Sequence, residues 1–165
     1  MQSLVPILMG SRSDMSHAEA IARSLEGFGI AAELRIGSAH KTPAHVLDIL
    51  RQYEADPRPK VYITIAGRSN ALSGFVDAQV SAPVIACPPP SSSFAGADIY
   101  SSLRMPGGVA PAVVLEPSGA ALLAAKILAL ADTDVAARVA AFQASNRDTI
   151  VSDDAEITST AAEGV

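Results

Sequence analysis

Short apolar segments alternate with amphipathic ones along the whole chain. The apolar segments are nearly continuous and rich in β-branched residues, which is typical of strands buried on both faces of a sheet. The sequence therefore predicts strands at Leu4–Met9, Ala32–Ile36, Val61–Ala66, Val84–Cys87 and Ala112–Leu115.

The amphipathic segments carry their apolar residues at the spacing of a helix. In Met15–Phe28 these residues recur every three or four positions from Ala18 to Leu25, and glycines follow at positions 27 and 29. Strands that alternate with helices are expected to lie parallel and to be joined by right-handed crossovers. We therefore expect an α/β fold, a three-layer α/β/α doubly wound parallel sheet with a C-terminal helix. The other predicted helices are Pro43–Tyr53, Asn70–Val80, Ser118–Leu130 and Asp132–Ile150.

The length of 165 residues suits one domain with a single core. We expect that domain to span residues 1–151. Residues 152–165 are polar and poor in large apolar side chains, so they predict a C-terminal tail that is frayed or docks on a neighbouring subunit.

One stretch interrupts the alternation of strands and helices. Pro88–Ser93 suits neither a helix nor a central strand, and together with Met105–Gly108 it brackets the short segment Ala97–Arg104. Two interpretations stay open: a surface excursion, or a wall or lid of a binding site.

Composition and charge exclude several classes of protein. Hydrophobic residues make up 49% of the chain and charged residues 18%, so the chain is not disordered. A net charge of −5 disfavours nucleic acid as a partner, and any phosphorylated ligand must be captured by local geometry. The single cysteine, Cys87, allows no internal disulfide and has no cysteine partner for a zinc site.

The sequence also argues against a membrane protein. The longest apolar run, Ala120–Ala131, contains Lys126 and is too short to span a bilayer. The N-terminus shows no basic stretch followed by an apolar one, so no export signal is expected. We therefore expect a soluble, cytoplasmic protein.

Ligands of an open parallel sheet bind beyond the carboxyl ends of its strands. Three segments with small and polar residues occupy that position here: Gly10–Asp14, Gly37–Pro43 and Gly67–Asn70. The first loop has a glycine, two serine hydroxyls and the start of a helix, so it either binds an anion or simply caps that helix. The chain contains no dinucleotide-binding or P-loop motif.

The second loop places His40 and Lys41 side by side at the start of a predicted helix. Such a histidine can exchange a proton near neutral pH and such a lysine can neutralise a phosphate, although a solvated basic turn is the alternative. His17 and His45 lie inside predicted helices without metal-ligand spacing, so we expect structural or surface roles for them. The third loop lets a flat ring lie against its backbone, and its alternative is a tight turn with an Asn cap.

Five motifs occur in order between Val5 and Ile150, and together they are highly specific. They resemble the phosphoribosylaminoimidazole carboxylase family of purine biosynthesis. The segments that carry this resemblance are Gly10-Ser11-x-Ser13-Asp14, Ser38-Ala39-His40-Lys41, Ala66-Gly67-Arg68-Ser69-Asn70, Cys87-Pro88-Pro89 and Ser101-Ser102-Leu103-Arg104-Met105-Pro106.

The family has two classes, and the third loop separates them. The mutase class usually has His-Arg where this chain has His40-Lys41, and a Gly-Gly-Ala-Ala-His-Leu-Pro-Gly stretch after its third strand. This chain instead has Arg68-Ser69-Asn70 there, which looks like the second class, the carboxylase that takes carbon dioxide directly. The mutase remains the alternative activity.

The resemblance implies a role for each candidate residue. His40 is the base that removes the ring proton after carboxylation. Ser11 and Lys41 bind the 5′-phosphate, and Asp14 binds the ribose hydroxyls. Ser38 and the backbone from Gly67 to Ser69 bind the base and the new carboxylate, and Arg68 offsets its charge. The substrate-binding set is completed by Gly10, Ser13, Ala39 and Ala66. No metal and no other cofactor is implied, and small subunits of this family form homo-oligomers, tetramers or octamers.

A non-enzymatic module with the same architecture is the competing hypothesis. A receiver domain needs two acidic residues after the first strand and an aspartate after the third, where this chain has Gly10-Ser11 and Gly67-Arg68. A flavin site favours aromatic residues that stack on the ring, yet aromatic residues total 4% of the chain. We therefore expect the flavodoxin-like fold to serve an enzyme.

Overall fold

The structure is a computed structural model that describes residues 2–91 and 93–163. Its five strands form one sheet in the order β2-β1-β3-β4-β5, and each neighbouring pair is parallel. This is the flavodoxin-like strand order, so the predicted doubly wound parallel sheet is confirmed. The strands are β1 (Leu4–Met9), β2 (Ala31–Ile36), β3 (Tyr62–Ile65), β4 (Val84–Ala86) and β5 (Ala112–Val113).

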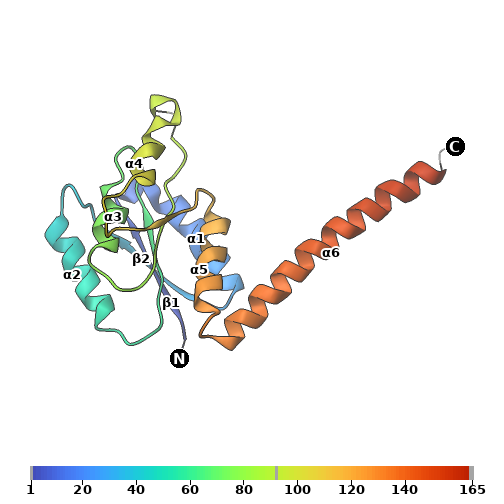
Figure 1. The fold of residues 1–165 in the computed structure, drawn as a ribbon, viewed down its shortest axis with the longest axis horizontal. Helices are drawn as coiled ribbons and strands as arrows, with labels where there is room; N and C mark the ends of the chain where they lie inside the picture. The colour runs from blue at the N-terminus through green and yellow to red at the C-terminus, as the bar shows by residue number, and fades with distance from the viewer. Residues whose placement is uncertain (1, 92, 164–165) are drawn as a thin grey trace.

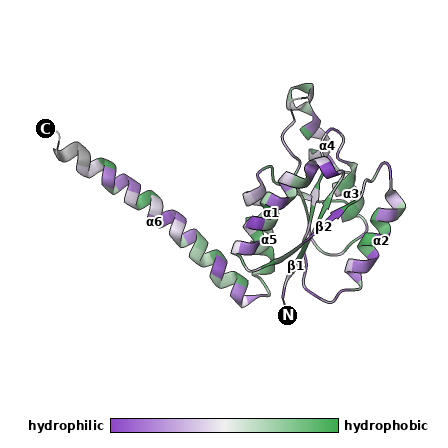
Figure 2. Ribbon diagram, turned by 180° about the vertical axis from the view of Figure 1, so that it is seen from behind, coloured by the Kyte–Doolittle hydropathy of each residue, from purple (hydrophilic) through white to green (hydrophobic). Residues whose placement is uncertain are grey.

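Helices cover both faces of the sheet, as Figure 1 shows. One face packs against α1 (Met15–Gly27), α5 (Pro117–Leu128) and the first turns of α6 (Thr133–Glu163). The other face packs against α2 (Pro43–Glu54) and α3 (Ala71–Asp77). Figure 2 shows the apolar residues gathered on the strands and on the sheet-facing sides of these helices.

Strand β1 explains why the strands read as continuous apolar runs. Its side chains alternate between the two faces: Val5 and Ile7 join the core under α1 and α5, whereas Leu4 and Leu8 join the core under α2 and α3. All four are fully buried. A central strand covered by helices on both sides has no polar face, as the sequence pattern predicted.

The connection between β4 and β5 contains two short elements. These are η2 (Ser93–Ile99), a 3-10 segment, and α4 (Tyr100–Leu103). Both lie above the carboxyl edge of the sheet in Figure 1. Within η2, Phe94 and Ala95 adopt left-handed backbone conformations, with φ of 55° and 51°.

The last helix is longer than the sequence predicted. Helix α6 continues from Thr133 to Glu163, so the end expected at Ile150 is wrong. No glycine or proline interrupts this segment, and the fading apolar pattern was therefore no stop signal. The division into a domain and a tail at residue 151 stays a prediction, and α6 crosses it without a break.

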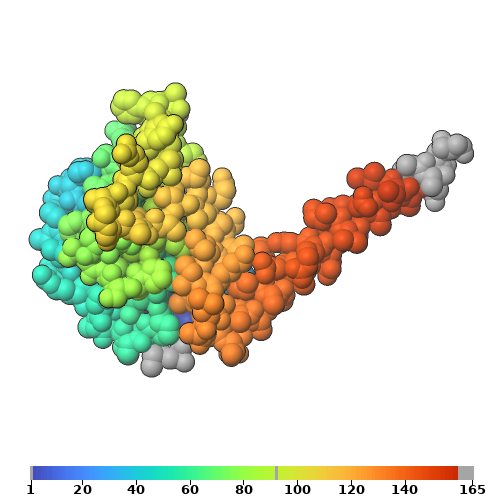
Figure 3. All heavy atoms as spheres, in the orientation of Figure 1, coloured from blue at the N-terminus to red at the C-terminus, as the bar shows by residue number. Residues whose placement is uncertain are grey.

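The first turns of α6 pack against the rest of the chain. Val135 and Val139 are buried, and the ring of Phe142 meets Phe28 edge to face at 5.4 Å between ring centroids. Beyond this point the helix extends away from the body, as Figures 1 and 3 show.

Helix α2 lies so close to the end of β2 that only glycine fits at position 37. A Cβ there would come within 2.8 Å of Val46 Cγ2. We expect Gly37→Ala to lower the free energy of unfolding by about 1–3 kcal/mol, because the overpacked atoms must move. Gly27→Ala is the matched control, since a Cβ at this exposed end of α1 meets no atom within 4 Å. Urea denaturation of both variants measures the difference, and equal unfolding midpoints would contradict the close packing.

Candidate active site

The loops after β1, β2 and β3 meet in one cavity of about 670 Å³ at the carboxyl edge of the sheet. These strands are neighbours, so their following loops converge as the sequence predicted. Every residue that the sequence analysis assigned to the site lines this cavity: Gly10, Ser11, Ser13, Asp14, Ser38, Ala39, His40, Lys41, Ala66, Gly67, Arg68 and Ser69.

The first loop leads through a 3-10 turn, η1 (Arg12–Asp14), into α1. Ser11 caps this turn by accepting a hydrogen bond from the backbone N–H of Ser13 at 3.3 Å. The capping alternative therefore holds for Ser11, which also lines the cavity. Asp14 precedes α1 but makes no side-chain capping bond to it. Its half-buried carboxylate lies in the cavity wall and can accept hydrogen bonds from a ligand.

Hydrogen bonds within the second loop hold it in a closed turn. The carbonyl of Ser38 accepts from the Thr42 amide at 2.8 Å, and the Ser38 amide donates to Thr42 Oγ1 at 3.0 Å. Ser38 Oγ accepts from the Lys41 amide at 3.2 Å. Pro43 then starts α2 at its first position. The turn presents His40 and Lys41, both exposed, to the cavity.

The third loop is a tight turn with a left-handed residue. The Ser69 amide donates to the Gly67 carbonyl at 2.6 Å, and Arg68 has a φ of 55°. Asn70 caps α3 by accepting from the Ser73 amide at 3.1 Å, so the Asn-cap alternative also holds.

The amides of Arg68 and Ser69 already have partners inside the protein. The Arg68 amide donates to Asp98 Oδ2 at 3.2 Å, and the Ser69 amide is the one that closes the turn on Gly67. The sequence analysis assigned this backbone to the new carboxylate. In the structure these two N–H groups bond within the protein, and Arg68 and Ser69 line the cavity. The role of this backbone in binding stays a prediction.

The proline segment after β4 forms a wall of the cavity, a possibility that the sequence left open. Pro89, Pro90 and Ser91 line it, and Pro89 Cγ lies 3.6 Å from where a Cβ on Gly67 would be. The same prolines line a second, more apolar cavity of about 390 Å³ together with Asp98. The sequence analysis named this segment as a possible wall but assigned none of its residues to the site, because a proline-rich loop does not show which of its residues meet a ligand.

Of the three histidines, His40 alone lines the cavity. His45 is exposed on α2, and His17 Nε2 lies 3.3 Å from Cys87 Sγ in a partly buried contact. Burial lowers the pKa of His17 and raises the pKa of the Cys87 thiol to about 12. A thiol this hard to ionise is a poor nucleophile near neutral pH, and the structural role of His17 stays a prediction.

The described part of the chain contains neither a cluster of metal ligands nor a membrane-spanning helix. Among residues 2–91 and 93–163, no three His, Cys, Asp or Glu side chains are grouped closely enough to hold a metal ion. No helix in the same part of the chain has the length and apolar character needed to cross a membrane.

Comparison with known proteins places the chain in a family. Residues 4–149 match the family described as AIR carboxylase. Phosphoribosylaminoimidazole carboxylase from Treponema denticola is 62% identical over 157 residues, which cover 95% of this chain and 99% of that protein. The bifunctional phosphoribosylaminoimidazole carboxylase/phosphoribosylaminoimidazole succinocarboxamide synthetase of Rattus norvegicus is 43% identical over 129 residues, 78% of this chain and 30% of that protein.

A solved structure shows the same fold. The crystal structure of Treponema denticola PurE matches with a TM-score of 0.92 over 94% of this chain and 98% of that one, at 62% identity. Three findings agree with the five motifs of the sequence. They are the family match, the identity to the Treponema denticola protein over almost the full chain, and the shared fold. This chain belongs to the AIR carboxylase family.

Proposed function

We propose that this enzyme carboxylates 5-aminoimidazole ribonucleotide with free carbon dioxide and yields 4-carboxy-5-aminoimidazole ribonucleotide for purine biosynthesis. The observation that carries the proposal is that His40, Lys41, Arg68 and Ser69 line the same cavity. The names of the Treponema denticola and Rattus norvegicus relatives support the same activity.

Local donors hold the nucleotide, because the protein's net charge of −5 gives no general attraction for a phosphate. Lys41 supplies a charge-assisted hydrogen bond to the 5′-phosphate, and the hydroxyl of Ser11 supplies a second donor. Asp14 accepts hydrogen bonds from the ribose hydroxyls. The small residues Gly10 and Ala66 let the ligand approach the backbone closely.

The reaction forms one carbon–carbon bond and breaks one carbon–hydrogen bond. The amino group pushes electron density into the ring, and the ring carbon attacks the carbon of carbon dioxide. One C=O electron pair moves to oxygen, which gives a carboxylate on a ring carbon that still carries its hydrogen. His40 takes that proton, and the electrons of the C–H bond restore the aromatic ring. The guanidinium of Arg68 offsets the charge that develops on the carboxylate.

A side-by-side assay of two substrates separates direct carboxylation from the mutase activity. We expect 5-aminoimidazole ribonucleotide and bicarbonate to give the carboxylated product without ATP, at a rate that rises with dissolved carbon dioxide. The isomer that carries the carboxylate on its amino nitrogen should be converted poorly. The loop after β3 has arginine and serine side chains that can bind the carboxylate formed when carbon dioxide adds to the ring, and the mutase class has glycine and alanine at this place. Efficient conversion of that isomer, with no response to added bicarbonate, would assign the mutase activity instead.

Replacement of His40 tests the proton transfer. We expect His40→Asn to lower kcat by about two to four orders of magnitude, the usual contribution of a general base, while nucleotide binding is largely kept. His45→Asn is the matched control, because His45 is exposed on α2 outside the cavity, and its kcat should stay within twofold of wild type. Steady-state kinetics measure both variants, and a His40→Asn enzyme with a third of wild-type turnover would rule out this role.

The enzyme assembles as a homo-oligomer, a tetramer or octamer, through the part of α6 that leaves the body. Phe142, where the helix leaves the body, is 42% exposed, and Ile150 and Ile157 beyond it are 69% and 71% exposed. At about 100° per residue they lie within about 80° of one another around the helix, so they form one apolar stripe. We expect a second copy of this chain to cover this stripe, because small subunits of this family form homo-oligomers. The cytoplasmic location expected from the sequence stays a prediction.

Light scattering tests the assembly. We expect a stable mass that is a multiple of the 16.9 kDa chain at micromolar concentration. The double variant Ile150→Asp/Ile157→Asp should form smaller species, since charges on the stripe are costly to bury. Val151→Asp places a charge off the stripe, about 100° from Ile150 and about 120° from Ile157 around α6, and should leave the mass unchanged. A wild-type mass near 17 kDa would contradict the proposal, and an unchanged double variant would exclude the stripe as the contact.

A further inference from the structure

The segment after β4 holds the third loop of the site at three points. Asp98 Oδ2 accepts from the Arg68 amide at 3.2 Å, and Ser101 Oγ accepts from the Asn70 amide at 2.9 Å. Ser102 Oγ accepts from Asn70 Nδ2, also at 2.9 Å. The last contact is inaccessible to water, because Asn70 and Ser102 are 3% and 2% exposed. Three residues close together in one segment therefore bond two residues of the loop that lines the cavity.

In this contact each group can act in only one way, as a donor or as an acceptor, because its other hydrogen bonds are already made. A serine hydroxyl has one proton, and Ser101 donates it to the Asp98 carbonyl at 2.7 Å, so toward Asn70 it acts only as an acceptor. The orientation of the Asn70 amide is set as well, because its oxygen accepts from the Ser73 amide while its nitrogen donates to Ser102. The arrangement has one consistent pattern of protons, as expected for a preformed structural contact.

The loop needs such support because of Arg68. A left-handed conformation is costly for a residue with a side chain, and it persists only where neighbouring groups impose it. Arg68, with its φ of 55°, is the residue whose amide bonds Asp98. The turn that this conformation creates puts the side chains of Arg68 and Ser69 on the cavity wall.

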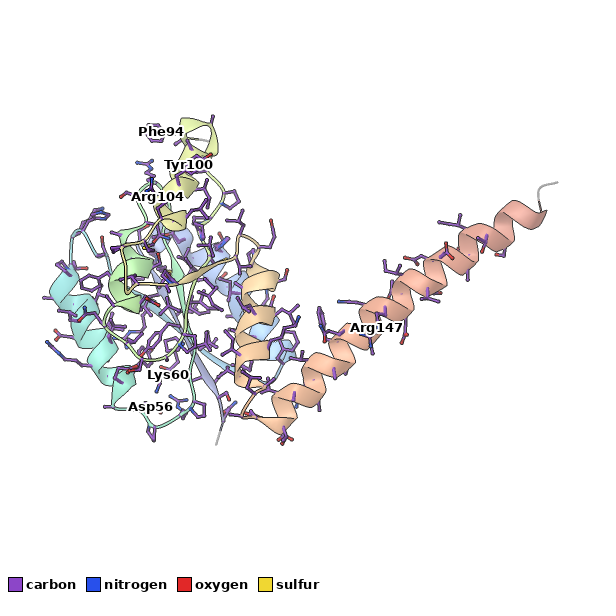
Figure 4. The ribbon with its side chains drawn as sticks, viewed as in Figure 1. Asp56, Lys60, Phe94, Tyr100, Arg104 and Arg147 are labelled. Atoms are coloured by element: carbon purple, nitrogen blue, oxygen red, sulfur yellow. The ribbon has the colours of Figure 1, made fainter. Side chains whose placement is uncertain are left out.

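We propose that Asp98 and Ser101 are positioning residues that hold the Arg68-Ser69-Asn70 loop in the shape that receives the new carboxylate. Neither residue lines the nucleotide cavity, so both act through the loop. Figure 4 shows their segment by its labelled neighbours: Phe94 stands at the tip, and Tyr100 and Arg104 lie between the tip and the sheet edge. The effect on turnover rests on the proposed carboxylation, whereas the effect on the loop does not.

A different function for Asp98 predicts the opposite result. The Asp98 carboxylate accepts the hydrogen bond of the Arg68 amide. It would act as a placeholder for the product if the product's carboxylate took over this hydrogen bond during the reaction. Removal of a placeholder would strengthen product binding, whereas removal of a support would weaken it. The structure favours the support, because Asp98 is anchored a second time, through its carbonyl, to Ser101.

Asp98→Ala, Asp98→Asn and Ser101→Ala test the proposal. The control is Asp77→Ala, because Asp77 Oδ2 accepts from the Ala110 amide at 2.8 Å in the same kind of contact, away from the cavity. In the ligand-free protein, hydrogen exchange of the amides at 67–70 should become about tenfold faster in Asp98→Ala and Ser101→Ala. Asp98→Asn should restore most of the protection, since its amide oxygen still accepts, and Asp77→Ala should leave exchange at 67–70 unchanged.

Kinetics and product binding supply the second measurement. We expect Asp98→Ala to lower kcat and to weaken binding of 4-carboxy-5-aminoimidazole ribonucleotide, each about tenfold, with KM for the uncarboxylated nucleotide within threefold of wild type. Unchanged exchange at 67–70, or tighter product binding by Asp98→Ala, would overturn the proposal. If wild-type protein fails to carboxylate 5-aminoimidazole ribonucleotide, the proposed function fails, and hydrogen exchange still decides whether Asp98 and Ser101 hold the loop.

Discussion

The parallel pairing of β2, β1 and β3 is the constraint on which the site depends. Met9, the last residue of β1, pairs with Ile36 on one side and with Ile65 on the other. Those two residues also end their strands, so three loops begin at the same height along one edge. Antiparallel pairing would send alternate loops to the opposite edge. The sheet therefore assembles, from segments far apart in sequence, polar groups that no single loop could supply.

The sequence predicted most of the fold and of the cavity because both depend on short-range signals. Buried strands such as Leu4–Met9 are recognisable from their apolar runs, and the rule for parallel sheets then places the loops that follow them at one edge. The predicted length was less accurate for the edge strand β5, which pairs with β4 alone. This strand has two residues, against the four expected at Ala112–Leu115. The prediction was wrong for the end of α6, where apolar periodicity fades but no residue stops the helix.

The contact of Asp98 with Arg68 shows why parts of the site escaped sequence reasoning. It joins residues thirty positions apart through a loop with no periodic pattern, and it depends on the left-handed conformation of a residue that is not glycine. For the same reason the sequence could not show that the amides of Arg68 and Ser69 have partners inside the protein. Whether a backbone N–H is free for a ligand depends on which partner the folded loop brings to it, and residue types alone do not specify that partner.

The long connection between β4 and β5 is explained by the support that the third loop requires. The second loop closes on itself through Ser38 and Thr42, so it needs no outside partner. The third loop is bent by Arg68 and must be held from outside. Asp98, Ser101 and Ser102 in this connection supply that support. A long connection has an entropic cost, and such connections are uncommon in compact domains unless they are functional. Three consecutive prolines at the start of this connection lower this cost by restricting the unfolded chain, and they also place Pro89 against Gly67 as the cavity wall.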